Sequence, residues 1–189
     1  SSGLMGISLA EALADRGITV DLVCGPSSLQ VQHPLINRIN VKTAAEMLAA
    51  CKPLATKASL LVMAAAVADY TPAEKLSYKL KKEDTIKTLA LKPTVDILKT
   101  LAAKKKQHQI VVGFALETNN EIENAKKKLH TKNADFIVLN SLNDEGAGFG
   151  VTTNKVSLID ASDNITDIPL QSKKLVAETI LDHVLQRIL

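Results

Sequence analysis

The sequence is poor in aromatic residues and in cysteine. Aromatic residues make up 3% of its 189 residues, and it contains no tryptophan. Because stacking on nucleic-acid bases needs aromatic faces, this composition argues against a single-strand nucleic-acid binder. Cys24 and Cys51 are far apart in the sequence and lack metal-ligand spacing, which indicates free thiols in a reducing compartment. We therefore predict no metal site formed by the protein's own side chains.

Long apolar runs and a strong charge bias are also lacking. The longest apolar run, 59–68, is too short to span a bilayer. The net charge is only +3, and the lysines are spread over several segments instead of forming one basic stripe. With 46% hydrophobic and 23% charged residues, the composition is that of a globular protein. We predict a soluble, cytoplasmic protein that binds neither membrane nor nucleic acid.

Helical and extended patterns alternate along the chain. We predict helices over 5–16, 43–57, 95–105, 121–132 and 172–189, and strands over 19–23, 36–41, 60–66, 110–116, 136–139, 156–159 and 165–170. This order predicts one α/β domain over 1–189. The fold is expected to be a Rossmann-like, three-layer fold with a mostly parallel sheet, helices on both faces and a small C-terminal β-hairpin at Asp163-Asn164.

Several segments carry more specific expectations. The run 60–66 is apolar throughout, which is typical of a central parallel strand covered on both faces. Residues 73–84 are polar and rich in lysine, which indicates a mobile surface loop followed by an extended segment over 85–91. Residues 143–153 form a glycine-rich loop. The chain opens on a loop that enters a helix, so we expect a first strand upstream and a longer parent chain.

Ligands of open parallel sheets bind beyond the carboxyl ends of the strands. The predicted strand ends there are Gly25-Pro26, Asp69-Tyr70, Glu117-Thr118 and Asn140. The segment 1–3 adds backbone N–H groups and a helix dipole, a combination that suits phosphate, although an ordinary helix cap has the same residues. Asp69 follows an apolar strand at this edge, and the sequence leaves two interpretations open, a functional role and a structural one. These features together predict an anionic, phosphorylated ligand.

Two groups of lysines lie close behind these strand ends in the sequence. Lys79, Lys81 and Lys82 fall in the polar loop, and Lys128 and Lys132 lie four residues apart on one face of a predicted helix. Lysine ammonium groups neutralise a polyphosphate, and a loop that closes over it excludes water. The alternative is that both groups are ordinary solvated lysines.

Six strings that occur in order resemble one enzyme family. They are Ser-Ser-Gly-x-Met-Gly (1–6), Leu-Val-x-Gly-Pro (22–26), Ala-Ala-Ala-Val-Ala-Asp-Tyr (64–70), Lys-x-Lys-Lys (79–82), Val-Gly-Phe-Ala-x-Glu-Thr (112–118) and the lysine-rich helix that leads to Asp135. In this order and with these gaps, the strings resemble phosphopantothenoylcysteine synthetase, the C-terminal domain of the bifunctional coenzyme A biosynthesis flavoprotein. The resemblance covers essentially the whole chain.

The resemblance implies a ligase that uses CTP and Mg²⁺ to activate 4′-phosphopantothenate as an acyl-cytidylate and then joins it to L-cysteine. It implies a homodimer, for which the 143–153 loop and the adjacent hairpin are our candidate contacts. FMN is expected only in the separate decarboxylase domain of such proteins. The family's catalytic asparagine lies two residues before Ser-Ser-Gly, upstream of this chain.

The residue-by-residue match, together with the helix entrance, gives the following candidate site. Catalytic roles fall to Lys79 and Asp69. Nucleotide contacts are expected at Ser1, Ser2, Gly3, Met63, Ala64, Ala65, Asp69, Lys79, Val95, Asp96, Ile97, Leu98, Phe114, Lys128 and Lys132. Contacts with the acyl substrate are expected at Ala65, Ala66 and Asp69.

Two other classes of function compete with this one. Tyr78 and Lys82 make a Tyr-x-x-x-Lys pair after a predicted central strand, as in short-chain NAD(P)-dependent oxidoreductases. Against that class, the strand 19–23 ends without an acidic residue for the adenosine ribose. The other alternative is a nucleotide-binding module without catalytic activity. Release of CMP, a change in nicotinamide absorbance, or neither would distinguish the three.

Overall fold

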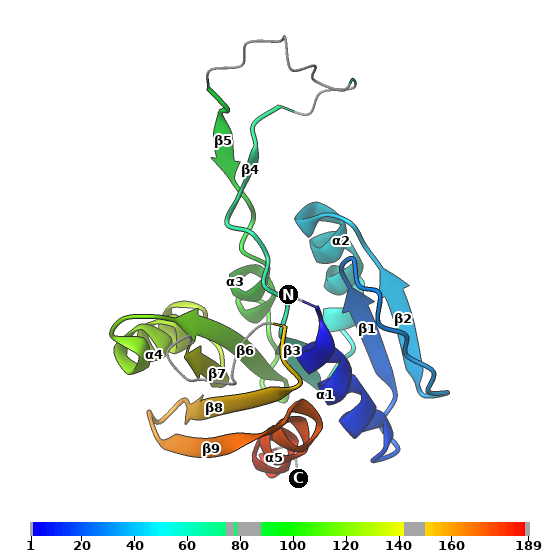
Figure 1. The fold of residues 1–189 in the computed structure, drawn as a ribbon, viewed down its shortest axis with the longest axis vertical. Coiled ribbons are helices and arrows are strands. Elements are labelled where there is room, and N and C mark those ends of the chain that lie inside the picture. Colours follow the sequence, from blue (N-terminus) through cyan, green and yellow to red (C-terminus); the bar gives the residue numbers. More distant parts are fainter. Residues whose placement is uncertain (1, 75–77, 79–87, 142–149, 188–189) are drawn as a thin grey trace.

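A five-stranded mixed sheet forms the centre of the molecule (Figure 1). The computed structural model describes residues 2–74, 78, 88–141 and 150–187. The strand order is β3-β6-β7-β8-β9. The strands are β3 (Leu60–Met63), β6 (Ile110–Glu117), β7 (Phe136–Ser141), β8 (Thr153–Asp160) and β9 (Ile165–Ser172). β3, β6 and β7 are parallel, and the predicted C-terminal hairpin, β8–β9, continues the sheet in antiparallel fashion.

The other predicted parallel strands form a small sheet of their own. β1 (Val20–Cys24) pairs with β2 (Ile36–Asn40) in parallel, and in the described part of the chain neither pairs with β3. The prediction of a central strand over 60–66 was therefore wrong, since β3 ends at Met63 and forms an edge of the five-stranded sheet. The run 60–66 is apolar because most of its side chains pack against the two cores on either face of the sheet. A Cβ on Gly6 would lie 3.7 Å from the Cβ of Ala64, so this alanine packs under a helix.

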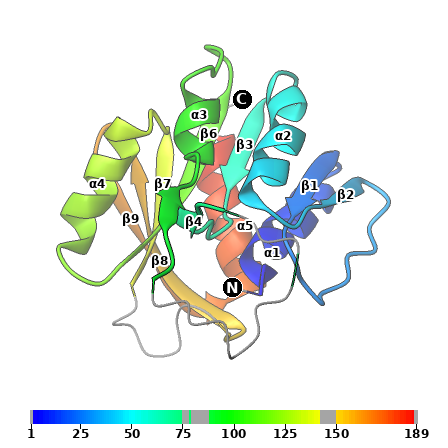
Figure 2. The same ribbon diagram turned by 90° about the horizontal axis from the view of Figure 1, so that it is seen from above.

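Helices cover both faces of the sheet, as predicted (Figure 2). α1 (Leu4–Ala14) and α5 (Lys173–Leu185) cover one face, and α2 (Ala44–Ala55), α3 (Ile97–Ala102) and α4 (Glu121–Thr131) cover the other. The first core packs Leu13 and Ile180 against alternate residues of β6 and β7 such as Val138. The second core packs Leu101 and Leu129 on the opposite face of the same strands. The three-layer α/β architecture is confirmed.

Side-chain caps set where three helices begin. The hydroxyl oxygens of Thr43 and Ser172 accept hydrogen bonds from backbone N–H groups three residues on, and the Asp96 carboxylate does the same. The helix predicted over 95–105 is therefore shorter, because its cap at Asp96 makes Ile97 the first helical residue. The Glu46 carboxylate accepts a hydrogen bond from the backbone N–H of Lys42 at 2.7 Å. In the predicted capping box, this glutamate therefore reaches back to the residue before the Thr43 cap.

The amino ends of the parallel strands are fastened by buried polar groups. Gln109 is 5% exposed, and its Nε2 donates to the carbonyl oxygen of Ala55 at 2.7 Å, at the end of α2. Asp135 accepts from the Lys105 ammonium at 2.7 Å and from the backbone N–H of Val111 at 2.8 Å. These bonds satisfy groups that burial at a helix end would otherwise leave without partners. This edge of the sheet is therefore built for stability.

A thin ribbon projects from the body between β3 and α3 (Figure 1). It consists of β4 (Tyr70–Pro72) and β5 (Leu91–Pro93), which pair antiparallel. The predicted lysine loop, 73–84, and the extended segment, 85–91, fall on this excursion, although 75–77 and 79–87 lie outside the described residues. β5 begins at Leu91, at the end of the predicted extended segment. The sequence did not predict the ribbon, because three-residue strands have too short a pattern to recognise.

The hairpin β8–β9 turns where the sequence predicted, and both of its strands are longer than predicted. Asp163 takes a positive φ of 62°, a conformation that Asp and Asn tolerate better than most residues do. The Asp160 carboxylate accepts from the backbone N–H groups of Ser162 and Asn164 at 2.8 and 3.0 Å. The glycine-rich loop was predicted over 143–153. Its residues 143–149 lie outside the described part, and Thr153 already belongs to β8.

Candidate active site

The entrance to α1 lies at the carboxyl edge of the sheet, as the sequence predicted. Gly3 caps the helix with a positive φ of 82° and no side-chain cap, a conformation that suits glycine. Ser2 Oγ accepts from the backbone N–H of Leu4 at 3.3 Å. The carbonyl oxygen of Ser2 accepts from Ser27 Oγ at 2.8 Å, which ties the helix entrance to the loop after β1. The remaining first-turn N–H groups are available to an anion. Ser1 lies outside the described residues.

Two predicted contacts, one directly after β3 and one on β6, lie on the same face of the sheet, beneath α1. Ala64 and Phe114 are partly buried, and both pack against the core beneath α1 and α5. Met63 pairs with Gly113 in the parallel ladder and faces the opposite layer, where it packs against the other core. The structure therefore brings the α1 entrance, Ala64 and Phe114 together at one edge, and places the Met63 side chain on the other side of the sheet.

The next predicted contacts form an exposed backbone turn at the base of the ribbon. Ala65, Ala66 and Asp69 are exposed. The carbonyl oxygen of Asp69 accepts from the backbone N–H of Thr94 at 2.8 Å, and Thr94 Oγ1 donates to the carbonyl oxygen of Ala68. These bonds fix the backbone of the turn and leave the Asp69 carboxylate in solvent. The side chain is therefore free to meet a ligand at this edge.

The segment 95–98 holds its predicted residues in different environments. Val95 is 59% exposed, whereas Ile97 is 4% exposed and lies in the core. Leu98 packs onto β6 at Gly113, where a Cβ would come within 2.8 Å of Leu98 Cδ2 and 2.7 Å of Ile137 Cδ1. A larger residue at 113 would force the ends of these two side chains to shift. Any contact of Ile97 or Leu98 with a nucleotide must then come from the backbone.

Asp96 and the two helix lysines form one charged cluster. The Lys132 ammonium donates to Asp96 Oδ2, and Lys128 is close enough for its charge to act on the same carboxylate. Burial by itself raises the pKa of Asp96. The hydrogen bonds from Lys132 and from the Lys99 backbone, and the two lysine charges, outweigh burial and lower the pKa below its usual value. Asp96 is therefore ionised, and Lys132 has a carboxylate partner before any ligand binds.

Two features of this edge were not among the predicted site residues. Asn154, at the start of β8, is 2% exposed, and its Nδ2 donates to Asn140 Oδ1 at 2.8 Å. Lys173, at the start of α5, is 5% exposed; its ammonium donates to the carbonyl oxygen of Val151 at 2.6 Å, and burial lowers its pKa. The position of Asn140 at a strand end was a usable signal, but no pattern in the sequence marked Asn154 or Lys173. Lys79 lies outside the described residues.

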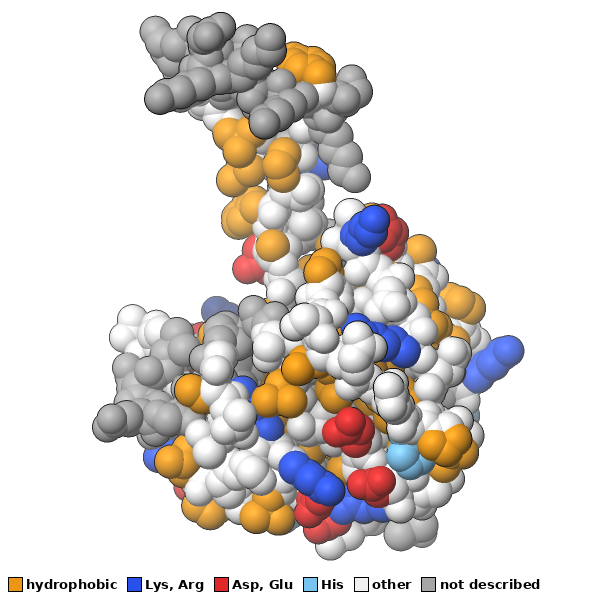
Figure 3. Space-filling model, turned by 45° about the vertical axis from the view of Figure 1, so that its right-hand side comes forward, with side chains coloured by type: hydrophobic (Ala, Val, Ile, Leu, Met, Phe, Trp, Pro, Cys, Tyr) orange, Lys and Arg blue, Asp and Glu red, His pale blue; other side chains and the backbone are white. Residues whose placement is uncertain are grey.

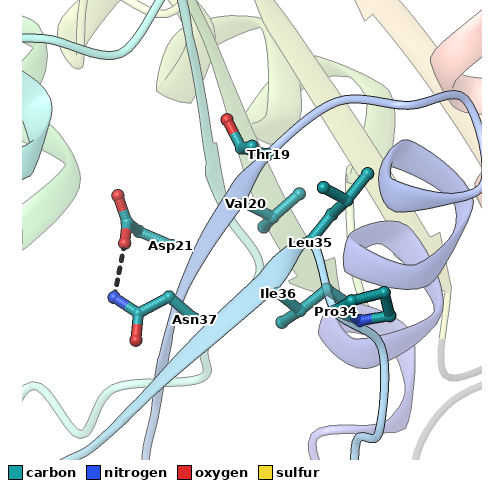
Figure 4. A pocket seen from close by; sticks show the side chains of 7 residues that line it. All are labelled: Thr19, Val20, Asp21, Pro34, Leu35, Ile36 and Asn37. Carbon is teal, nitrogen blue, oxygen red and sulfur yellow. Dashed lines mark hydrogen bonds between the residues drawn. The ribbon is translucent and has the colours of Figure 1, made fainter.

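Two hollows on the described surface lie at the opposite edge. One, of about 390 Å³, is lined by the amino ends of β1 and β2, and Asn37 Nδ2 donates to Asp21 Oδ1 across it at 2.8 Å (Figure 4). The other, of about 370 Å³, lies beside Phe136 and Arg187. Neither includes a predicted site residue. The described residues contain no cluster of three or more His, Cys, Asp or Glu side chains, and no helix among them is long and apolar enough to cross a membrane.

Comparison with known proteins decides the family. Residues 1–188 match the family described as the DNA/pantothenate metabolism flavoprotein C-terminal domain. The chain belongs to this family. It is 43% identical over 184 residues to the coenzyme A biosynthesis bifunctional protein CoaBC of Bacillus subtilis strain 168, covering 97% of this chain and 45% of that protein. It is 46% identical over 185 residues to a protein named cysteine/cysteine sulfinic acid decarboxylase from an unknown prokaryotic organism, covering 98% of this chain and 52% of that protein.

Two solved structures share the fold. The crystal structure of the C-terminal domain of the bifunctional protein CoaBC has a TM-score of 0.80 and 35% identity, and the alignment covers 97% of this chain and 82% of that one. The Cab2 mutant H337A in complex with phosphopantothenate-cysteine has a TM-score of 0.76 over 100% of this chain and 78% of that one. At 19% identity, the second likeness shows the fold alone. The chain spans about half the length of the curated relatives it matches.

Proposed function

We propose that this chain is the phosphopantothenate–cysteine ligase part of a coenzyme A biosynthesis enzyme. In the first half-reaction, a carboxylate oxygen of 4′-phosphopantothenate attacks the α-phosphorus of CTP, and the bond to pyrophosphate breaks. In the second, the cysteine amine attacks the acyl carbon, the bond to CMP breaks, and the amine loses a proton. The observation that carries the proposal is the match of residues 1–188 to this family. A named coenzyme A biosynthesis protein is 43% identical to the chain over 184 residues.

The carboxyl edge supports a phosphate-bearing ligand. The first turn of α1 has no side-chain cap at Gly3, so the helix dipole and its N–H groups other than that of Leu4 are available to an anion. Ala64 beside this turn is a small residue, and the exposed alanines after it leave the backbone accessible to the acyl substrate. Phe114 offers an apolar surface at the same edge. We expect the nucleotide phosphates at α1 and the base towards α3 and α4.

Magnesium fits this site as part of the CTP complex. The Asp69 carboxylate is exposed, and the described residues hold no cluster of three metal ligands. Mg²⁺ keeps most of its water and binds through one or two carboxylates and substrate phosphates. When bound to the triphosphate, it neutralises charge there. The chain's own contribution is to orient the phosphates at α1 and to add cations from Lys79, Lys128 and Lys132.

The decarboxylase name of one relative does not change the proposal. This chain corresponds to 52% of that protein, so the name describes a chain about twice as long. The resemblance of the sequence places flavin-dependent decarboxylation in a separate domain. The oxidoreductase alternative gains no support from Tyr78, which is 65% exposed and lies outside the described helices.

We further propose that the protein acts as a homodimer. Tyr70, Leu89 and Leu91 on and beside the β4–β5 ribbon are 62%, 63% and 56% exposed, and apolar side chains gather along this ribbon (Figure 3). A two-stranded ribbon has no core of its own. On the edge strand β9, Ile165 and Leu170 are 41% and 49% exposed. The β8–β9 hairpin remains a candidate dimer contact, and we add the β4–β5 ribbon as a second one.

A turnover assay tests the proposed function. The full-length natural protein is incubated with CTP, Mg²⁺, 4′-phosphopantothenate and L-cysteine, and CMP and pyrophosphate are measured. We expect pyrophosphate in the first half-reaction without cysteine, and CMP only when cysteine is added. Replacing CTP with ATP tests the nucleotide. If the protein binds CTP and releases neither product, it is a binding module without catalytic activity; a change in nicotinamide absorbance identifies an oxidoreductase.

A further inference from the structure

Two hydrogen-bonded amides, one of them buried, lie at the carboxyl edge between the sheet and α1. Asn154 is the second residue of β8 and only 2% exposed, and its Nδ2 donates to Asn140 Oδ1 at 2.8 Å. The same Nδ2 lies 4.0 Å from the Sδ atom of Met5, in the first turn of α1. Asn140 is the second-last residue of β7 and is only partly buried. The pair therefore connects the end of one strand to the start of another directly beside the α1 entrance.

The register of the sheet puts Asn140 on the ligand side. Val138 pairs with Phe114, and Asn140 pairs with Leu116, two residues further along β6. Because side chains alternate along a strand, Asn140 shares the face of Val138 and Phe114, which is the face that α1 covers. Along the register, Asn140 lies two residues closer to the carboxyl edge than Phe114 does. At this position the continuous apolar run of β7 gives way to an amide.

The hydrogen bond from Asn154 fixes which way the Asn140 amide is turned. Its oxygen accepts from Asn154, so its nitrogen, on the opposite side of Cγ, points away from the Asn154 amide. Within the described part of the chain, the Asn140 nitrogen donates to no acceptor. Every buried side-chain nitrogen and oxygen there has a partner, so this nitrogen is open to solvent at the edge. The geometry leaves two N–H donors facing outwards on a rigid support.

We propose that Asn140 is a substrate-contacting residue that donates an N–H to an anionic oxygen of the reacting carboxylate or α-phosphate, and that Asn154 is its positioning residue. The inference rests on the proposed ligase function. A neutral donor held in place before reaction stabilises negative charge that develops on these oxygens and needs no reorganisation. Asn154 acts only through Asn140, because its own amide is buried and cannot reach a ligand.

Substituting Asn140→Asp gives the sharpest test. The aspartate keeps an oxygen that accepts from Asn154, so the fold is retained, but it replaces the N–H donors with a negative charge. In the full-length natural protein, we expect single-turnover pyrophosphate release to fall about a hundredfold or more, with an unchanged melting temperature. Asn140→Ser, which carries no added charge, should lose about tenfold. Gln107→Glu is the matched control, since it makes the same amide-to-acid change at an exposed position before β6.

A double-mutant cycle tests the role of Asn154. Asn154→Ala should slow pyrophosphate release per folded molecule about tenfold in the parent and should have no further effect in Asn140→Asp. A structural role alone predicts a lower melting temperature in both backgrounds and parent rates for the folded protein, which overturns the positioning role. If the parent releases pyrophosphate and Asn140→Asp releases it as fast as Gln107→Glu does, the role of Asn140 is overturned and the proposed ligase function stands. A parent that binds CTP without releasing pyrophosphate overturns the proposed function and the inference together.

Discussion

The Lys132 ammonium is hydrogen-bonded to the Asp96 carboxylate, which joins the end of α4 to the start of α3. The same carboxylate accepts from the backbone N–H of Lys99 at 2.8 Å and so caps α3. One acidic side chain therefore holds a helix start and a lysine that we expect to contact the nucleotide. Before CTP binds, this lysine already has a charged partner, and the two lysine charges keep Asp96 ionised.

Asp96→Asn separates the two roles of this residue. Asparagine caps helices about as well as aspartate, so α3 should be retained while one negative charge near the phosphates is removed. We expect CTP to bind about threefold more tightly by calorimetry at low salt, with the difference shrinking as salt rises. Asp96→Ala is the control, since it also removes the cap and should cost about 1 kcal/mol of stability. Weaker CTP binding by Asp96→Asn would mean that the carboxylate itself contacts the nucleotide.

Lys79→Gln tests the lysine of the polar loop. Charge on the α-phosphate grows as the carboxylate attacks, so a cation there helps the transition state more than the ground state. In the full-length natural protein we expect single-turnover pyrophosphate release to fall about a hundredfold, with little change in phosphopantothenate affinity. Lys81→Gln and Lys82→Gln should cost less. A Lys79→Gln rate within about threefold of the parent would make this loop an ordinary solvated one.

Gly113→Ala tests the close packing under α3. The new Cβ would come within 3 Å of Leu98 and Ile137, and such overpacking typically costs about 1–3 kcal/mol. Chemical denaturation measures the loss. Leu98→Ala in the same chain removes one of the two clashing groups and leaves Ile137 Cδ1, so the double variant should be more stable than the sum of the two single changes predicts. Gly25→Ala, where no atom lies within 4 Å of the added Cβ, should change stability little.

Gln109→Leu tests the polar fastening at the amino edge. The substitution leaves the carbonyl oxygen of Ala55 and the backbone N–H of Lys106 without their buried partner. Losing such partners costs about 1–3 kcal/mol each, so we expect a loss of about 2–6 kcal/mol in urea denaturation. Gln107→Leu, two residues away and exposed, should stay within about 0.5 kcal/mol of the parent. Equal effects of the two substitutions would contradict the role of Gln109.

Asp160 should make stability depend on pH in the acid range. Its burial raises the pKa, but hydrogen bonds from Asn164 and Ser162 and the charge of Arg187 outweigh burial and lower it. A carboxyl group with a lowered pKa in the folded state stabilises the fold above its unfolded pKa, and this contribution disappears as the pH falls through the folded value. Asp160→Asn should therefore be less stable than the parent at pH 7 by about 1–2 kcal/mol. In thermal melts the two should converge as the pH falls through the lowered pKa of Asp160.

The sequence by itself determined the elements and their layers. Long periodic runs such as 121–132 predict helices because their apolar spacing depends only on local geometry, and side-chain caps such as Thr43 mark helix starts within a few residues. The ordered strings also identified the family, since they record which residue types the site needs. These signals are local in the chain, so one sequence suffices to read them.

Only the tertiary structure decided which residues meet. An apolar run can pair in a sheet or pack under a helix, and 60–66 does both, with β3 ending at Met63 and Ala64 lying beneath α1. The contact between Asn140 and Asn154 joins residues fourteen positions apart through the β7–β8 register. Likewise, Asp96 meets Lys132 across two helices. Such pairings depend on strand register and helix packing, which sum many weak contacts over the whole chain, and no local pattern encodes them.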